Sequence, residues 1–163
     1  MNIKNECISL YREAFSDDDS SFEKALFENC FKFVKYLEKD GQVVSMFFLL
    51  PCKINSQDAF YLFAAATKEE FKNQGLMSEL INKNIGKTPI FLRPADNGLI
   101  KFYEKFGFKS FKAANSLNKE NSLIPAKNFK ELNTFAQADN SEFTLMAVNF
   151  ESESLINFAY SHF

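Results

Sequence analysis

The sequence predicts a mixed α/β fold in which helices flank a sheet, organised as a single domain spanning residues 1–163. Two observations lead to this class. An apolar hairpin pattern comes first, and the segments after it alternate between the apolar spacing of a strand and that of a helix. The chain has 163 residues, of which 46% are apolar and 25% charged, which is ordinary for one domain with a real core.

The first third of the chain predicts two helices followed by a hairpin. Apolar residues first recur at helical spacing, and the later segments read as strands. Lys39-Asp40-Gly41 is a hairpin-turn signal between the two strands. Pro51 either ends the second strand or bends it. In order, the expected helices are residues 3–15 and 21–30, and the expected strands are 31–37 and 42–50.

The rest of the chain predicts alternating strands and helices. The expected strands are residues 60–66, 89–92, 108–112 and 143–148, and the expected helices are 76–85, 98–106 and 152–160. Residues 113–142 are polar and hard to interpret, with a candidate helix at 128–137. No internal repeat or linker is visible.

Residues 61–82 are the most informative segment of the chain. An apolar strand pattern ends at Thr67, a polar turn follows, and an amphipathic helix opens after Gly75. The first amides of a helix have no partner within it, and its dipole is positive at that end, so an anion such as a di- or polyphosphate binds well there. The alternative interpretation is a turn glycine with no ligand.

The turn resembles the acetyl-CoA-binding motif of the GNAT family of N-acetyltransferases, Arg/Gln-x-x-Gly-x-Gly/Ala. Here it reads Lys72-Asn-Gln-Gly75-Leu-Met77. Lys72 stands where the family has Arg or Gln, and Met77 where it has a small residue. Both departures leave the central glycine in place.

A second segment downstream strengthens the resemblance. Tyr103-Glu-Lys-Phe-Gly-Phe108 is similar to the Tyr-Glu-Lys-x-Gly-Phe ending found in family members, with Asp96 at the usual Asn position and Leu99 at the usual Ala position. The same residues also read as an ordinary helix capped by Asp96 or Asn97. The resemblance covers roughly residues 3–111 and is typical of a bacterial branch in which two helices replace the usual first strand.

The resemblance implies the acyl-CoA N-acyltransferase (GNAT) fold, with a mixed, mostly antiparallel central sheet flanked by helices. It also implies an N-acetyltransferase that moves an acetyl group from acetyl-CoA to an amine, with Tyr103 as the general acid near the sulfur. A phenol with a pKa of about 10 stays protonated at neutral pH and donates to a forming thiolate. The alternative for Tyr103 is a core position on an amphipathic helix. No general base is identifiable, because residues 59–66 contain no carboxylate.

The resemblance also assigns the contacts to acetyl-CoA. Backbone groups at the end of the strand would pair with pantetheine, the turn and helix start would receive the pyrophosphate, and an asparagine before the next helix would add a contact. These residues are Ala65, Ala66, Thr67, Lys72, Asn73, Gln74, Gly75, Leu76, Met77, Ser78 and Asn97. The alternatives are a small-residue strand packed under a helix and, for Lys72, a solvated loop lysine.

Composition limits the other partners. A net charge of −2 gives no reason to expect nucleic-acid binding. Three widely spaced cysteines and a single histidine, His162, supply neither a disulfide framework nor an ordinary metal site, so no metal is expected. With no signal-peptide or membrane-span pattern, we expect a cytoplasmic protein without a membrane partner.

The acceptor is expected to be a small-molecule or peptide amine, bound by the N-terminal helices and the C-terminal third. A homodimer is left open. The 21 phenylalanines reflect either base composition or an aromatic pocket. The second functional hypothesis is a non-catalytic CoA-binding or regulatory module, favoured by the missing base and by the departures at Lys72 and Met77.

Overall fold

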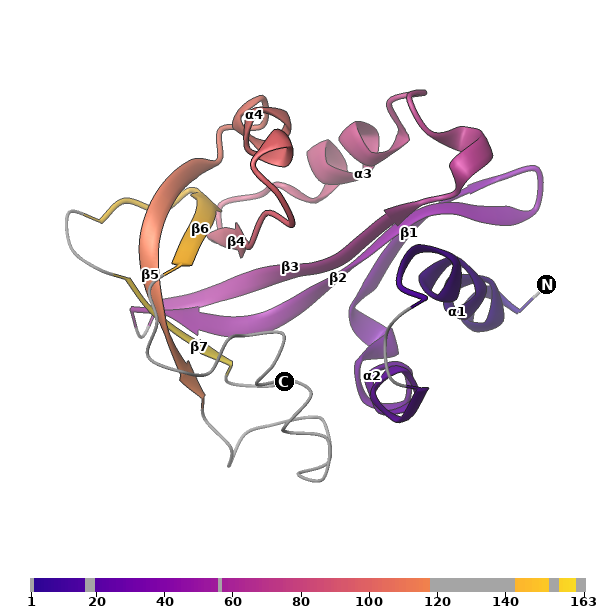
Figure 1. Ribbon diagram of the computed structural model, residues 1–163, viewed down its shortest axis with the longest axis horizontal. Helices are drawn as coiled ribbons and strands as arrows, with labels where there is room; N and C mark the ends of the chain where they lie inside the picture. The colour runs from indigo at the N-terminus through magenta and orange to yellow at the C-terminus, as the bar shows by residue number, and fades with distance from the viewer. Residues whose placement is uncertain (1, 17–19, 56, 118–142, 153–155, 161–163) are drawn as a thin grey trace. The chain divides into compact units, whose positions relative to one another are not determined.

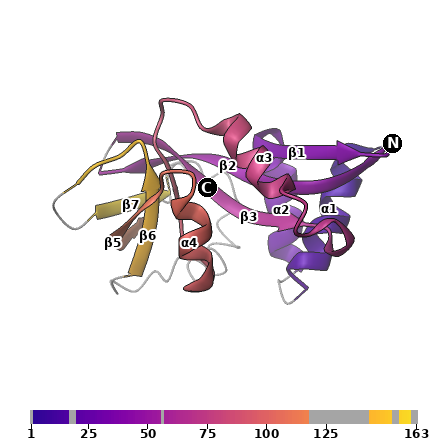
Figure 2. The same cartoon turned by 90° about the horizontal axis from the view of Figure 1, so that it is seen from above.

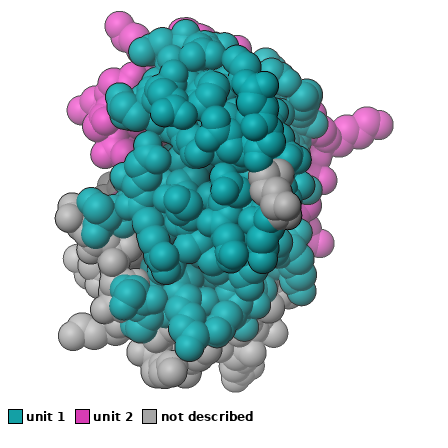
Figure 3. Space-filling model, turned by 90° about the vertical axis from the view of Figure 1, so that its right-hand side faces the viewer, with its two compact units in different colours: residues 1–49, 62–84 teal, residues 50–61, 85–163 magenta. Residues whose placement is uncertain are grey.

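The computed structural model of the chain (Figure 1) describes residues 2–16, 20–55, 57–117, 143–152 and 156–160. The chain divides into unit 1, residues 1–49 and 62–84, and unit 2, residues 50–61 and 85–163, coloured separately in Figure 3. Strands β2 (Gln42–Ile54) and β3 (Gln57–Thr67) run through both. The single domain expected over residues 1–163 stays a prediction, and the candidate helix at 128–137 lies outside the described residues.

Unit 1 is built from the N-terminal helices, the hairpin and the helix after β3. Figures 1 and 2 show α1 and α2 on one face of its strands and α3 on the opposite face. Asn2 caps the first helix, because its Oδ1 accepts from the amides of Lys4 and Asn5 at 3.1 and 3.3 Å. The elements are α1 (Ile3–Ala14), α2 (Ser20–Cys30), a 3₁₀ turn (Phe31–Phe33), β1 (Val34–Lys39), a second 3₁₀ turn (Glu69–Phe71) and α3 (Leu76–Asn84).

The hairpin between β1 and β2 follows the sequence prediction. The strands pair antiparallel from Val34 opposite Phe48 to Lys39 opposite Gln42. Asp40 and Gly41 form the two-residue turn with φ of 52° and 76°, as a type I′ turn requires. The strand expected at 31–37 begins later, because residues 31–33 form a 3₁₀ turn.

Aromatic side chains fill the core of unit 1 between α2 and the sheet. Phe27 packs edge-on against Phe48 with ring centroids 5.3 Å apart, and Phe22 meets Phe63 at 6.4 Å. All four rings are buried. Edge-to-face pairs of this kind add to the stabilisation from burial. These four phenylalanines are therefore core residues of unit 1.

Unit 2 contains most of the sheet. It comprises the remainder of β2 and β3 together with β4 (Ile90–Leu92), α4 (Gly98–Glu104), β5 (Lys109–Leu117), β6 (Phe143–Val148) and β7 (Ile156–Tyr160). Strand pairs β4–β6, β5–β6 and β2–β7 are antiparallel, whereas β3–β4 and β5–β7 are parallel. Hydrogen-bonded neighbours follow the order β1-β2-β3-β4-β6-β5-β7. The predicted mixed, mostly antiparallel sheet flanked by helices is confirmed.

Two elements differ from their predictions. The helix expected at residues 152–160 is wrong, because residues 156–160 form β7, which pairs with both β2 and β5. Strand β2 also passes through Pro51 to Ile54. Proline lacks an amide proton, but its fixed φ lies within the extended region, so it removes one hydrogen bond without ending a strand.

Candidate functional site

The predicted phosphate-binding segment is a continuous part of unit 1 that links β3 to α3. Asn73 and Gly75 both adopt left-handed backbone conformations, with φ of 60° and 76°. The carbonyl of Gly75 accepts from the amide of Glu79 at 2.9 Å, so the helix begins immediately after this glycine. The amides of residues 76–78 therefore belong to the first turn, where helix geometry provides no internal acceptor.

The surroundings of Gly75 leave room for a ligand. A Cβ added at this position would meet no atom within 4 Å. The glycine is therefore required by its φ and not by a neighbouring side chain. Residues 73–75 are exposed in front of the first helical amides, so an anion can approach them. A positively polarised helix start that follows an exposed turn with open space around its glycine can accept an anion.

The end of β3 is irregular in the region predicted to pair with pantetheine. Ala64 has a φ of 53°, a left-handed conformation that is unusual inside a strand and typical of a local bulge. Ala65 and Thr67 are half-buried, and Ala66 is buried. The pairing of these backbone groups with pantetheine stays a prediction.

The residues after Thr67 are anchored from other parts of unit 1. The amide of Lys68 donates to the carbonyl of Val44 at 2.9 Å, and its ammonium donates to Gln42 Oε1 at 2.7 Å. The amide of Glu69 donates to Glu13 Oε1 at 3.2 Å. The sequence analysis missed Gln42 and Glu13, because they lie far from the turn along the chain and carry no local motif.

Two lysines contribute charge around the turn. The ammonium of Lys72 lies 2.5 Å from Glu69 Oε2, and both side chains are exposed. Lys39 donates to Gln74 Oε1 at 3.3 Å, and its ammonium lies 5.5 Å from the centre of the Phe71 ring. The positive charge of Lys72 is thus already balanced by a carboxylate, whereas Lys39 contacts neutral groups of the turn.

Tyr103 lies in unit 2, in the last turn of α4. It is 7% exposed and packs against Phe102 and Phe108, with ring centroids 5.1 and 5.8 Å away. Burial raises the pKa of its hydroxyl to about 12. This environment keeps the phenol protonated, as a general acid requires, and it equally suits a core tyrosine. The catalytic role of Tyr103 stays a prediction.

Asn97 precedes α4 but does not cap it with its side chain. Its backbone is helical, and its side chain makes no capping hydrogen bond. Asp96 provides the cap instead, because its Oδ1 accepts from the amide of Leu99 at 3.1 Å. Asn97 is exposed, and its contact with CoA stays a prediction. Of the predicted site residues, 65–67 and 72–78 therefore lie in unit 1, whereas Asn97 and Tyr103 lie in unit 2.

No carboxylate in the turn stands out as a general base. Glu69 is paired with Lys72, and Glu13 accepts from the amide of Glu69. Strand β3 carries Asp58, whose Oδ1 lies 2.6 Å from the ammonium of Lys53. Within the described ranges, no group of three His, Cys, Asp or Glu residues is arranged to hold a metal ion. The helices in that part of the chain are also too short or too polar to span a membrane.

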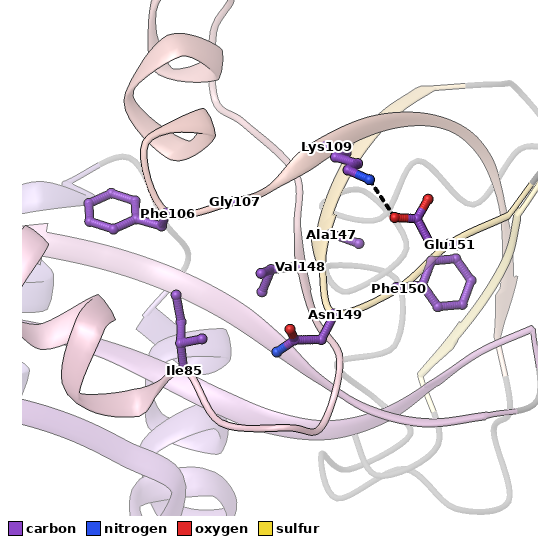
Figure 4. A pocket seen from close by; sticks show the side chains of 9 residues that line it. All are labelled: Ile85, Phe106, Gly107, Lys109, Ala147, Val148, Asn149, Phe150 and Glu151. Carbon is purple, nitrogen blue, oxygen red and sulfur yellow. Dashed lines mark hydrogen bonds and ion pairs between the residues drawn. The ribbon is translucent and has the colours of Figure 1, made fainter.

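A separate hollow of about 470 Å³ lies in unit 2 (Figure 4). Ile85, Phe106 and Val148 give it an apolar lining, and Lys109 forms an ion pair with Glu151 beside it. It includes none of the predicted site residues. Its lining is apolar apart from one ion pair, and this combination points to no particular ligand or reaction.

Comparisons with known proteins identify the family and the fold of the chain. Residues 3–108 match the family model described as "Acetyltransferase (GNAT) family". No curated protein matches the chain in sequence. Many solved structures match its fold.

Three of these structures illustrate the similarity, and their low identities show the fold alone. A histone acetyltransferase HPA2 and related acetyltransferase from Corynebacterium glutamicum has a TM-score of 0.61 and 15% identity, with 93% of each chain covered. The ribosomal-protein-S18-alanine N-acetyltransferase from Escherichia coli has a TM-score of 0.56 and 17% identity, with 93% of this chain and 92% of that one covered. A GNAT family N-acetyltransferase from Escherichia coli, solved with CoA, has a TM-score of 0.59 and 13% identity, with 98% and 86% covered.

Proposed function

The chain belongs to the GNAT family of acetyltransferases, and we propose that it transfers an acetyl group from acetyl-CoA to an amine of a small molecule or peptide. One observation carries the proposal. The exposed, left-handed turn at Asn73 and Gly75 leads directly into the start of α3, within the segment that matches the family. That arrangement suits a diphosphate, and the likeness to a structure solved with CoA supports the same donor.

The residues of unit 1 would hold the donor, whose thioester supplies an activated acetyl group. The amides of residues 76–78 would bind the pyrophosphate, with Lys72 adding a charge once its pairing with Glu69 loosens. Backbone groups of Ala65, Ala66 and Thr67 would pair with the pantetheine amides. Side-chain identity matters little for such pairing, which agrees with the small residues found there.

Tyr103 would act as the general acid of the transfer. When the amine attacks the thioester carbonyl, the carbon–sulfur bond breaks and the sulfur leaves with the electron pair. A carbon–nitrogen bond forms in its place, and the nitrogen releases one proton to water as the amide forms. The Tyr103 hydroxyl donates a proton to the sulfur and regains one from solvent. Its pKa of about 12, raised by burial, keeps the hydroxyl protonated at neutral pH, which is the form that a general acid needs.

The acceptor in this proposal arrives as a neutral amine or loses its proton through water, because no carboxylate is assigned as the base. A peptide amine is supported by the fold shared with the ribosomal-protein-S18-alanine N-acetyltransferase. Nucleic acid, metal and membrane have no part in the reaction. A cytoplasmic location also belongs to the proposal, and the buried thiols of Cys7 and Cys30, which form no disulfide, support it.

The second candidate function is a CoA-binding module without catalysis. The unassigned base and the pairing of Lys72 with Glu69 favour it. Both candidates predict CoA binding, so only turnover distinguishes them.

The test combines binding with turnover on the purified full chain. CoA binding is measured as a rise in the unfolding temperature, since a ligand that binds only the native state stabilises it. Turnover is measured as thiol release from acetyl-CoA with a panel of small amines and of peptides with free N-termini. Amine-dependent thiol release supports the transferase. Binding without release on any amine supports the module, and no binding at millimolar CoA would overturn both.

A further inference from the structure

Among the described residues, Ser45 on β2 is a polar residue that is completely buried, with 0% of its surface exposed. Its Oγ lies 2.9 Å from Thr67 Oγ1 and donates to the carbonyl of Ala66 at 3.4 Å. A serine hydroxyl has one proton to donate and two lone pairs that accept. Because Ser45 donates to Ala66, the Thr67 hydroxyl donates to Ser45, and the three groups form a chain of hydrogen bonds.

This chain of hydrogen bonds holds the end of β3 where the strand is irregular. Ala64, with a left-handed φ of 53°, lies three residues before Thr67. The bond from the Lys68 amide to Val44 continues the attachment of the segment to β2. A buried hydroxyl is costly when it has no partner, so the buried Ser45 favours one rotamer of Thr67 and one orientation of the Ala66 carbonyl.

We propose that Ser45 is a positioning residue for the acyl-CoA site. Its hydroxyl fixes Thr67 and the Ala66 peptide, and through them the direction in which the chain enters the turn at residues 72–78. Ser45 does not touch the ligand in this inference and acts only through β3. The inference rests on the proposed function, because it concerns the same binding segment.

The test separates positioning from ordinary stabilisation with one double variant. Ser45→Ala and Thr67→Val each leave a polar group without its partner, so each lowers the unfolding midpoint in urea. The double variant S45A/T67V removes both hydroxyls and leaves only the Ala66 carbonyl without its former donor, so its midpoint returns part of the way toward that of the wild type. Thr67→Ser keeps the hydroxyl, and Ser110→Ala is a matched control at an exposed strand serine of unit 2.

The second readout is the Kd for CoA from calorimetry. We expect each single variant and the double variant to bind about 5- to 10-fold more weakly, the equivalent of one hydrogen bond. Thr67→Ser should bind more tightly than Thr67→Val, and Ser110→Ala should match the wild type. The positioning role is supported if the double variant regains stability in urea but still binds CoA more weakly than the wild type.

Two results would overturn the inference. They differ in whether the proposed function survives. If the wild type binds CoA and the double variant binds it equally well, the hydroxyl pair only stabilises the fold and the proposed function stands. If the wild type does not bind CoA, the proposed function fails and the positioning role falls with it. Should Ser45→Ala fail to fold, Thr67→Val at the half-buried position gives the same comparison.

Discussion

Gly41 and Gly75 share a φ of 76°, and at neither glycine would an added Cβ meet an atom within 4 Å. Both lie in unit 1, one in the β1–β2 turn and the other at the start of α3. A β-branched residue pays the same backbone strain at each position. The same substitution at the two glycines therefore introduces the same strain, but only the one at Gly75 changes the candidate site.

Gly75→Val is predicted to abolish the CoA-dependent rise in unfolding temperature while the protein still folds. The valine side chain would occupy the open space in front of the first helical amides, and the backbone would tend to leave its left-handed conformation. Gly41→Val should lose a similar amount of stability, of order 1 to 3 kcal/mol, and keep the rise. Thermal denaturation with and without CoA measures both, and equal ligand responses in the two variants would contradict the assignment of the turn.

Changes at Lys72 and Glu69 are predicted to alter CoA affinity in opposite directions. Lys72→Met removes a cation from the site, whereas Glu69→Gln removes the carboxylate that lies 2.5 Å from that cation. We expect a Kd increased about 2- to 5-fold in the first variant and decreased in the second, since exposed charges contribute modestly. Both changes should shrink in high salt. Titrations at two ionic strengths test this, and equal Kd values would leave Lys72 a solvated lysine.

Tyr103→Phe is predicted to lower turnover more than it weakens acetyl-CoA binding. The hydroxyl is needed as the thiolate forms, so its loss affects the transition state more than the bound ground state. The expected fall in kcat is on the order of 10- to 1,000-fold. Tyr36→Phe, on the exposed β1, is the matched control and should leave kcat unchanged. An unaltered kcat in Tyr103→Phe, with chemistry shown to be rate-limiting, would remove Tyr103 from the mechanism.

The buried hydroxyl of Tyr103 also predicts a loss of stability in alkali. Its pKa is about 12 in the folded protein, above the ordinary value of 10, so the folded state keeps a proton that the unfolded state loses. The contribution is complete below pH 10 and disappears as the pH rises toward 12, by roughly 2 to 3 kcal/mol in total. Urea unfolding from pH 8 to 11.5 should show the wild type losing stability faster than Tyr103→Phe. Parallel curves would show that the hydroxyl titrates normally.

Local signals explain why much of the fold and the candidate turn could be predicted. Asp40-Gly41 favours one turn type, and Gly75 followed by amphipathic spacing favours a helix start; both predictions match the structure. The strand β7 was missed because its pairing partners, β2 and β5, are distant in sequence. The alternation of Ile156, Phe158 and Tyr160 is a strand signal that could have identified it.

The anchors of the candidate site could not be predicted in the same way. Ser45 lies in an apolar strand, where the sequence alone does not show that its hydroxyl meets Thr67. Glu13 and Gln42 look like ordinary surface residues until the fold brings them to the residues that follow Thr67. Such contacts depend on strand register and helix orientation, which local composition does not determine.

Strands β2 and β3 each cross from one unit to the other, at residues 49–50 and 61–62. Neither unit is therefore a continuous stretch of chain. No single truncation yields either unit, because each cut would sever a strand in its interior and leave unpaired backbone groups at the break. A fragment-swapping or domain-insertion strategy should treat the segment from Gln42 to Thr67 as indivisible and place its junctions outside that segment.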